Sequence, residues 1–372
     1  MSRYLVNDIT KVDSRAKLTT AVISNLVGLQ ALQKDYIQAV GDAGLKILKD
    51  TIICVGESIF KTERDITLNS ANLDSGSFAV GKDYYIYCCD RGNKNDEEYK
   101  ISLNSTFPVG YNAENSRKIG GFHYGDVRRI KADTLEPINS SGSAWGAGWE
   151  DNIYQGILPF SVWTLLHRPK SSPEGMVYCA SIGKWVDIYL TSTNYRSEYN
   201  ATPMTGSEGL MYWDWHEKIA RKLKKFPLSY LEFCSVADGS PNGRDDSNDY
   251  GWTKTTNSGR NKTGIIAKAV SSYGLKDCTG NVWEVGKDIA YSTQTTGGGS
   301  WGFKNGTEVK KGAHYTAFNN DVDVTLHGGH WNDGVSCGSR AVNCNNYLWN
   351  VNTNVGCRLA CDDCIYTPDL IV

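Results

Sequence analysis

The chain lacks the features that mark membrane, exported and nucleic-acid-binding proteins. It has no run of about 18 apolar residues, which a transmembrane helix would need, so no membrane insertion is expected. Its 39 basic and 41 acidic side chains give a net charge of −2 without long blocks of one sign, which argues against a nucleic-acid partner. Residues Met1 to Leu5 lack the basic and apolar regions of a signal peptide, and we expect none.

Metal-binding motifs are also missing. The 11 cysteines include one C-x-x-C pair, Cys361 and Cys364, without a second pair or nearby histidines, so structural thiols are favoured over a metal site. His216 and Glu217 begin an H-E-x-x-H pattern that fails at Ala220. We therefore expect no cofactor and no bound metal.

Aromatic residues and glycine are abundant instead. The 11 Trp, 21 Tyr and 38 Gly are typical of irregular β-rich domains and of binding surfaces. At 372 residues the chain exceeds what one hydrophobic core usually supports. We expect an α+β fold in three parts: a helical segment over 1–50, a small β-rich region with a linker over 51–157, and a ligand-binding domain over 158–372.

The pattern between residues 15 and 50 predicts a helix, because apolar residues recur with alternating spacings of four and three. Two interpretations are open. The helix could form a coiled coil and so a homo-oligomer, with Gln33 fixing the register. It could also pack on its own domain, since its glycines weaken a long helix. The apolar positions are Val22, Leu26, Leu29, Tyr36, Val40, Ala43 and Ile47.

Two later segments carry clear local patterns. The run from Tyr84 to Tyr87 is aromatic and β-branched and predicts a strand in the β-rich region. In the segment 213–223, Trp215, Ile219 and Leu223 are spaced four apart, which predicts a short amphipathic helix.

Four glycine–aromatic motifs then occur in a fixed order. They are Gly280–Glu284, Gly297–Trp301, Gly328–Trp331 and Gly356–Leu359, with Ser229–Phe233 before them. This order resembles the formylglycine-generating-enzyme branch of the C-type lectin fold. The glycines allow close backbone approach or positive φ, while the indoles fill the core.

Within the last motif, Arg358 is predicted to be a buried residue whose guanidinium has a structural role. We expect a carboxylate such as Glu284 to hold it, because an unpaired buried charge is costly.

The resemblance does not carry over the enzymatic residues. In the copper oxidases of that family the catalytic cysteines correspond to Asp333 and Gly338 here, and Cys337 beside the second position has no partner thiol. The related sulfoxide synthases need three histidines, and the histidines here are scattered. An oxidase or sulfoxide synthase is kept as an alternative, but a protein that is not an enzyme is favoured.

A second alternative is a calcium-dependent sugar-binding lectin. Trp331, Asn332 and Asp333 spell the Trp-Asn-Asp signature of such lectins. The loop that supplies the other oxygen ligands in them is absent, and calcium generally needs six to eight oxygens.

The segment 328–358 resembles the variable region of proteins diversified by retroelements, a family that includes phage tropism determinants. Randomised adenines in asparagine codons never give Lys, Glu, Gln, Met or Trp. The composition of the segment fits this restriction apart from Trp331, which belongs to the glycine–tryptophan motif, and Trp349. The resemblance implies a hypervariable protein that binds a protein or glycan on a cell surface, located on a phage tail or a bacterial exterior. The expected ligand-binding residues are His330, Asn332, Asp333, Val335, Ser336, Cys337, Ser339, Asn343, Cys344, Asn345, Tyr347, Leu348, Trp349 and Asn350.

Overall fold

The computed structural model describes residues 28–93, 96–291, 300–302, 311–316 and 322–364, and this part of the chain is mostly β. Its contacts divide it into two compact units. Unit 1 contains the described residues up to Phe122 together with Val162–His167, and unit 2 contains His123–Ser161 and Arg168–Cys364. These limits do not coincide with the boundaries at 50/51 and 157/158 that the sequence suggested.

Unit 1 is built from small antiparallel sheets. The strand predicted around Tyr84 is confirmed as part of β7, where Tyr84 and Tyr87 are buried. Two sheets have three strands each, β1-β4-β5 and β2-β3-β6, and a third contains β7, β8, β9 and β11. The strands are β1 (Leu29–Gln30), β2 (Ile37–Val40), β3 (Gly44–Ile47), β4 (Ile52–Val55), β5 (Ser58–Lys61), β6 (Ile66–Leu68), β7 (Lys82–Asp90), β8 (Glu97–Ser102), β9 (Ser116–Arg128) and β11 (Trp163–Thr164).

The predicted N-terminal helix is wrong over residues 28–50, and the rest of it lies outside the described residues. Here β2 and β3 pair as an antiparallel hairpin, with Gly41 at φ +60° in the turn. Leu45 and Ile47 alternate into the core as strand residues do. Over residues 36–47, the apolar residues are spaced by four and three because two short strands flank a tight turn.

This correction changes the fold class and one expected partner. The fold is mostly β rather than α+β, because all α-helical segments of the described residues are short and lie in unit 2. Residues 28–50 form strands and not a helix, so this part of the chain does not support homo-oligomerisation through a helix.

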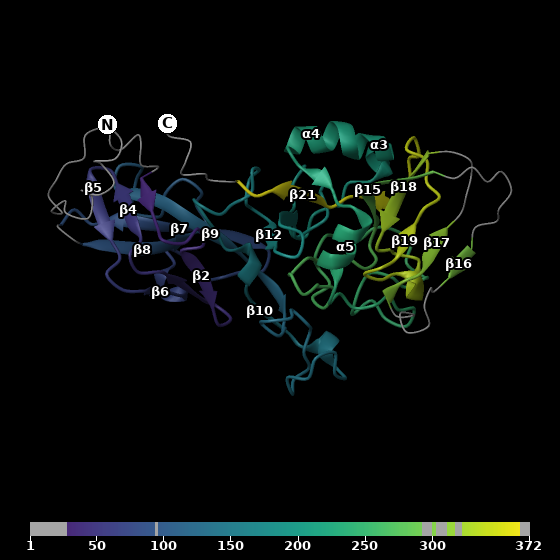
Figure 1. Cartoon of the computed structure of the whole chain (residues 1–372), viewed down its shortest axis with the longest axis horizontal. Helices are drawn as coiled ribbons and strands as arrows, with labels where there is room; N and C mark the ends of the chain where they lie inside the picture. Colours follow the sequence, from purple (N-terminus) through teal and green to yellow (C-terminus); the bar gives the residue numbers. More distant parts are fainter. Residues whose placement is uncertain (1–27, 94–95, 292–299, 303–310, 317–321, 365–372) are drawn as a thin grey trace. The chain divides into compact units, whose positions relative to one another are not determined.

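Unit 2 contains two larger sheets, whose strands run from teal through green to yellow in Figure 1. One has the order β12-β13-β21-β14 and the other β16-β17-β19-β18-β15-β20, while β10 (Ile153–Ile157) pairs with the second half of β9. The strands of the two sheets are β12 (Met176–Cys179), β13 (Lys184–Asp187), β14 (Phe226–Pro227), β15 (Trp283–Tyr291), β16 (Ser300–Gly302), β17 (His314–Thr316), β18 (Val322–His327), β19 (Val342–Asn343), β20 (Val355–Gly356) and β21 (Leu359–Asp362).

The helical segments of unit 2 follow the sequence patterns. The helix predicted over 213–223 is confirmed as α3 (Tyr212–Asp214), a π-helical turn (Trp215–Ile219) and α4 (Ala220–Leu223), with Trp215 buried. Helix α5 (Tyr230–Ala237) begins after Ser229, whose side chain accepts the N–H of Glu232. No helix among the described residues has the length and apolar content needed to cross a bilayer.

Candidate ligand-binding surface

The segment 328–358 begins at a turn that only glycine can form. Gly328 and Gly329 follow β18 with φ values of +89° and +91°. A Cβ on Gly328 would lie 2.6 Å from the Cys278 carbonyl oxygen, and one on Gly329 would lie 2.5 Å from Cys337 Sγ. The turn therefore fixes where the chain leaves the sheet, independently of the side chains that follow.

A buried ion pair supports the other end of the segment. The Arg358 guanidinium donates to Glu284 Oε1 at 2.9 Å and to the carbonyl oxygens of Asp187, Ile188 and Lys276. Glu284 stands on β15, beside the start of β21, and burial raises the pKa of its carboxyl group while Arg358 opposes that shift. The predicted pairing of Arg358 with Glu284 is confirmed.

A neutral histidine lies under the turn. His327, the last residue of β18, is fully buried against the ring of Phe233 at 5.0 Å between centroids. Burial lowers the pKa of His327 to about 3. Its Nε2 lies 3.0 Å from Thr325 Oγ1, so a single hydroxyl satisfies one nitrogen of an uncharged ring.

The first loop, 330–337, is fastened to a neighbouring loop by its backbone. The N–H of Gly334 donates to the Thr253 carbonyl at 2.7 Å, and the N–H of Gly243 donates to the Cys337 carbonyl at 3.1 Å. These bonds do not depend on side chains of the first loop. These two contacts to the neighbouring loop would therefore remain if the side chains of the first loop changed.

His330 and Asp333 form a polar pair on this loop. The Asp333 carboxylate accepts the backbone N–H of His330 at 3.0 Å and lies 3.6 Å from its Nε2. Nδ1 of His330 accepts the N–H of Asn332 at 3.0 Å, which leaves the proton on Nε2. Burial lowers the pKa of His330, although Asp333 opposes that shift.

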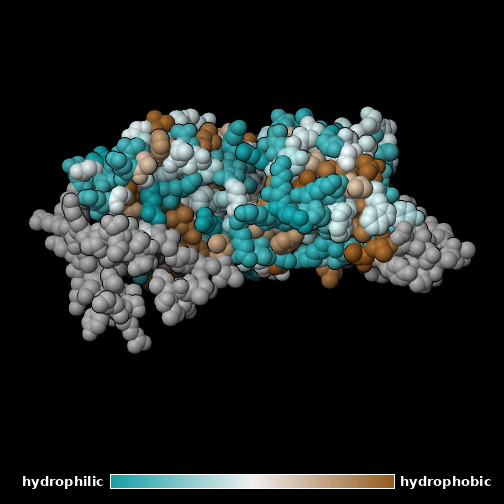
Figure 2. Space-filling view, turned by 90° about the horizontal axis from the view of Figure 1, so that it is seen from above, coloured by the Kyte–Doolittle hydropathy of each residue, from teal (hydrophilic) through white to brown (hydrophobic). Residues whose placement is uncertain are grey.

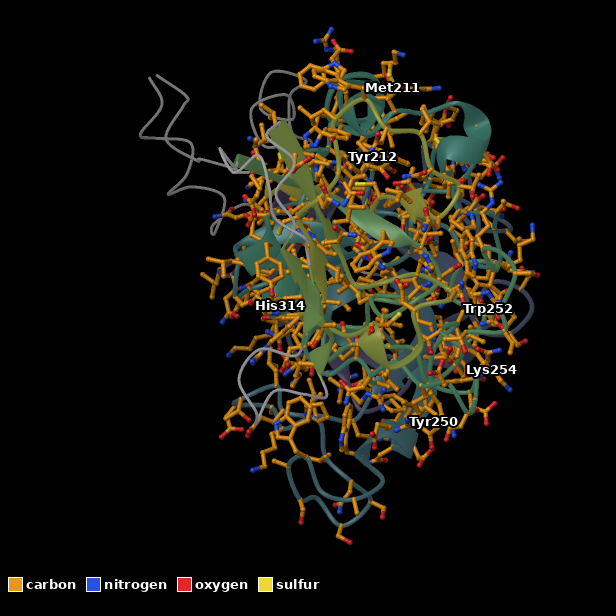
Figure 3. All side chains as sticks on the ribbon, turned by 90° about the vertical axis from the view of Figure 1, so that its right-hand side faces the viewer. Met211, Tyr212, Tyr250, Trp252, Lys254 and His314 are labelled. Atoms are coloured by element: carbon orange, nitrogen blue, oxygen red, sulfur yellow. The ribbon has the colours of Figure 1, made fainter. Side chains whose placement is uncertain are left out.

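The second loop, 344–354, is fastened to α3. The N–H of Trp213 donates to the Leu348 carbonyl at 2.9 Å and that of Tyr212 to the Asn350 carbonyl at 3.1 Å. The Asn352 side chain donates to the Tyr212 hydroxyl at 2.6 Å. Figure 3 faces this end of unit 2, with Met211 and Tyr212 at its upper edge and Trp252 and Lys254 at its right.

Exposure separates the expected ligand-binding residues into three groups. Cys337, Ser339 and Leu348 are buried, so their side chains do not lie on the surface of this structure. Asn332, Val335 and Trp349 are exposed. The half-buried members are His330, Asp333, Ser336, Asn343, Cys344, Asn345, Tyr347 and Asn350.

Sequence reasoning missed one exposed aromatic residue. Trp213 is 44% exposed beside the second loop, although it lies outside the segment. The available signal was its phase in the helical pattern, because Trp213 stands off the face that Trp215 and Ile219 share.

The Cys337 thiol is poorly suited to redox catalysis or to metal binding. Burial raises the pKa of Cys337 well above its ordinary value, and its thiol donates to the His330 carbonyl at 3.2 Å. A protonated, enclosed thiol is a poor nucleophile and a poor metal ligand. Among the described residues no group of three His, Cys, Asp or Glu side chains is placed to hold a metal ion.

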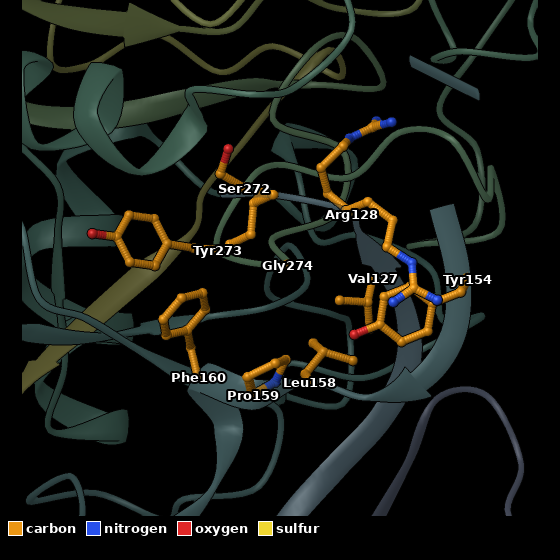
Figure 4. A pocket seen from close by; sticks show the side chains of 11 residues that line it. Val127, Arg128, Tyr154, Leu158, Pro159, Phe160, Ser272, Tyr273 and Gly274 are labelled. Carbon is orange, nitrogen blue, oxygen red and sulfur yellow. The ribbon is translucent and has the colours of Figure 1, made fainter. Parts of the chain in front are cut away.

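A small pocket of unit 2 lies apart from the segment. Its volume is about 110 Å³, and no residue of 328–358 lines it. Figure 4 shows the apolar side chains that enclose it, with the Tyr273 and Phe160 rings on one side. The lining includes Val127, Leu158, Pro159, Phe160, Tyr273 and Gly274.

Comparison with known proteins agrees with this architecture. Residues 35–150 match the family model of the Mtd second domain. The chain is 26% identical over 333 residues to the tail fiber receptor-binding protein of Bordetella phage BPP-1, covering 81% of this chain and 75% of that protein.

Solved structures of the Major Tropism Determinant share the fold. Its U1 variant matches with a TM-score of 0.68 and 23% identity, over 93% of this chain and 88% of that one. Its I1 variant matches with a TM-score of 0.67 and 23% identity, over 90% and 85%. The expected resemblance to lectin-fold phage tropism determinants is confirmed.

Proposed function

We propose that this chain, a relative of the phage tropism determinants, is a phage receptor-binding protein that recognises a molecule on the host cell surface. Its relative from phage BPP-1 is a tail fiber receptor-binding protein, which supports a place on the virion tail. The contact residues are the exposed and half-buried side chains of the segment 328–358.

One observation carries this proposal: much of the support for the backbone of the segment comes from groups other than its exposed side chains Asn332, Val335 and Trp349. The glycine turn, the Arg358–Glu284 pair and the backbone bonds to Thr253 and Trp213 hold both loops. Surface substitutions away from such features usually change the free energy of unfolding by less than about 0.5 kcal/mol. Binding specificity can then change without loss of the fold.

We also propose that the chain is not an enzyme. The positions that hold the catalytic cysteines in the resembling oxidases are Asp333 and Gly338, and Cys337 between them is enclosed. The calcium-lectin alternative is disfavoured because calcium generally needs six to eight oxygens, and among the described residues no group of three His, Cys, Asp or Glu side chains is placed to hold a metal ion. Both arguments favour recognition by contact surface alone.

The test is an exchange of surface residues within the segment. Asn332, Val335, Tyr347 and Asn350 are replaced together by different small polar residues such as Ser and Thr in the full chain. The adsorption of this variant to a panel of intact bacterial strains is then measured. We expect the set of bound strains to change while the Tm stays within a few degrees. An unchanged strain range, or a strongly lowered Tm, contradicts the proposal.

A further inference from the structure

A neighbouring loop contacts the first loop of the segment 328–358 at two points. We call residues 243–253 the supporting loop. The N–H of Gly243 donates to the Cys337 carbonyl, and the N–H of Gly334 donates to the Thr253 carbonyl. A Cβ on Gly243 would lie 2.0 Å from the carbonyl oxygen of Gly334, so the two backbones are in close contact. A shift of the supporting loop therefore shifts the first loop.

The two ends of the supporting loop are bonded to each other. The Thr253 hydroxyl donates to the Arg244 carbonyl at 2.8 Å and accepts the N–H of Arg244 at 3.0 Å. Thr253 is buried, which protects both bonds from water. The position of Arg244 is therefore coupled to both contacts with the first loop.

The side chain of Arg244 joins the supporting loop to a distant segment of unit 2. Its Nη2 donates to Glu150 Oε1 at 3.0 Å, and its Cζ lies 3.6 Å from the centroid of the Tyr250 ring. Glu150 belongs to the 3-10 turn Trp149–Asp151. Arg244 therefore links this turn to the supporting loop.

Tyr250 completes a network of charged and aromatic groups. Lys268 Nζ lies 4.4 Å from the centroid of the same ring. The Tyr250 hydroxyl donates to Asp151 Oδ1 at 2.9 Å, and Lys268 Nζ lies 2.6 Å from that oxygen. Ion pairs and cation–π contacts that share partners hold a loop better than isolated surface pairs do. Figure 3 shows Tyr250 at the lower right, below Trp252.

The turn that receives Arg244 is itself held by a buried side chain. The Arg128 guanidinium donates to the carbonyl oxygens of Trp149 and Glu150 at 3.1 and 2.6 Å. It also donates to the carbonyl oxygen of Lys268 at 2.9 Å. Both sides of the network to which the supporting loop is attached are therefore fixed by one residue.

The loss of the Arg244 side chain should shift the supporting loop and not release it. The N–H of Asn281 donates to the Trp252 carbonyl at 2.9 Å, and this bond does not involve Arg244. The bonds between the Arg244 backbone and Thr253 would also remain. The expected effect is a displaced first loop on a chain that is still folded.

The second loop of the segment has different supports. Its backbone is bonded to Tyr212 and Trp213 of α3. Figure 2 shows the face that carries α3 and α4, where hydrophobic residues interrupt a hydrophilic surface. A change at Arg244 should therefore act on the first loop and leave the second loop in place.

We propose that Arg244 is a positioning residue for receptor binding, which acts on the first loop through the supporting loop. The network that it forms with Glu150 and Tyr250 sets where residues 330–337 lie. The inference rests on the proposed function, because it concerns the same binding surface. It adds a residue outside the segment 328–358 on which binding by the first loop depends.

The experiment is a pair of double-mutant cycles in the full chain, and the probe is intact cells of a strain that adsorbs the unmodified chain. Arg244→Ala is combined with a first-loop set, Asn332→Ser and Val335→Thr, and separately with a second-loop set, Tyr347→Thr and Asn350→Ser. We expect Arg244→Ala to weaken adsorption about tenfold in the unmodified chain and in the second-loop set, but less than about threefold in the first-loop set.

Two further variants control for a general loss of structure. Arg244→Lys keeps the charge and should restore adsorption to within about threefold of the unmodified chain. The matched control is Arg91→Ala, which removes an arginine that pairs with Asp96 in unit 1 and should leave adsorption unchanged. The Tm of each variant should stay within a few degrees of the unmodified value.

Three results overturn the inference. Arg244→Ala may leave adsorption unchanged, its effect may be the same in the first-loop set as in the unmodified chain, or it may be reduced equally in both sets. The last result is expected of a general loss of stability and not of a displaced first loop.

The two sets on their own separate this inference from the proposed function. If neither set changes adsorption, the proposed function fails. If either set changes adsorption but Arg244→Ala shows no selective coupling to the first-loop set, the proposed function stands and this inference fails.

Discussion

At the scale of single residues, the clearest determinants of the site are buried charges beneath it. Arg358 and Glu284 are each nearly inaccessible, and the pair is completed by three backbone carbonyls. A buried ion pair of this kind adds little stability over an apolar pair of similar size, but losing one partner leaves an uncompensated charge. Its role here is to fix the start of β21 against β15.

Removing one partner of this pair should be strongly destabilising. Glu284→Gln keeps the shape of the side chain and removes its charge, so we expect a loss of about 3–5 kcal/mol in the free energy of unfolding. Urea denaturation measures it. The double variant Glu284→Gln/Arg358→Met should lose less than the single one. A double variant less stable than Glu284→Gln contradicts a coupled pair.

His327 should make stability depend on pH below neutrality. Its folded pKa of about 3 lies below its ordinary value of 6.5. Between these pH values the unfolded chain binds a proton that the folded chain does not, so stability falls as pH falls. The slope from this residue is about 1.4 kcal/mol per pH unit.

The variant His327→Gln isolates that slope. We expect the stability advantage of the unmodified chain over the variant to be constant above pH 7 and to shrink as pH falls toward 4. Urea denaturation at a series of pH values measures it. An advantage that does not change with pH shows that His327 is not held neutral.

The cysteines of the segment should differ in reactivity. Cys337 is fully buried, whereas Cys344 is half-buried, although burial raises the pKa of both thiols. Alkylation of the native chain with iodoacetamide, followed by mass spectrometry, should modify Cys344 well before Cys337. Equal rates of alkylation at the two cysteines would show that Cys337 is accessible to the reagent, contrary to the prediction.

At the scale of elements, the glycine turn after β18 positions the whole segment. We expect Gly329→Ala to destabilise the chain by about 1–3 kcal/mol, because it combines an unfavourable φ with a steric clash. Gly183→Ala is the matched control, with φ +66° in the same unit and no atom within 4 Å of the added Cβ. If Gly183→Ala destabilises the chain as much as Gly329→Ala does, the unfavourable φ alone accounts for the loss and the steric clash adds nothing. Thermal unfolding of both variants measures the difference.

The elements that could be predicted from sequence are those whose pattern is local. The spacing of Trp215, Ile219 and Leu223 predicted the helical segment from Tyr212 to Leu223. The ordered glycine and tryptophan motifs identified the lectin-like fold for the same reason.

Elements defined by distant partners could not be predicted. The apolar residues of the hairpin of β2 and β3 have a spacing that is also typical of a helix. The pairing of Leu45 with Leu68 on β6 joins residues that are distant in sequence. Within the expected site, the burial of Cys337 and Leu348 could not be predicted, because residues far away in sequence cover them. The exposure of Trp213 beside Trp349 depends on the same long-range packing.

At the scale of the whole molecule, the two units are not consecutive in sequence. The chain enters unit 2 at His123, within β9, returns to unit 1 for Val162–His167, and re-enters unit 2 at Arg168. Unit 2 therefore contains residues that precede the lectin-like motifs. Among them, Asp126 is one of the few charged side chains buried in that unit.

Those early residues should be essential for unit 2 to fold. Lys276 is buried and its Nζ donates to Asp126 Oδ2 at 3.0 Å. Arg128 donates to the carbonyl oxygens of Trp149, Glu150, Lys268 and Val270. A fragment that starts at the expected boundary, residue 158, would lack both side chains, and the buried Lys276 would lose the one carboxylate to which it donates a hydrogen bond.

The two boundaries can be compared directly with fragments 158–364 and 123–364. We expect 123–364 to give a near-ultraviolet circular dichroism spectrum with ordered tryptophans and a cooperative urea transition. Fragment 158–364 should lose at least about 3–5 kcal/mol from the unpaired Lys276, with further loss from the missing strand β10, and so should lack that transition. Within 123–364, Asp126→Asn should reproduce part of the loss, since it removes only the carboxylate. If fragment 158–364 unfolds as cooperatively and at the same urea concentration as 123–364, the early residues are dispensable, and the boundary expected from the sequence describes the folding unit better than the contacts do.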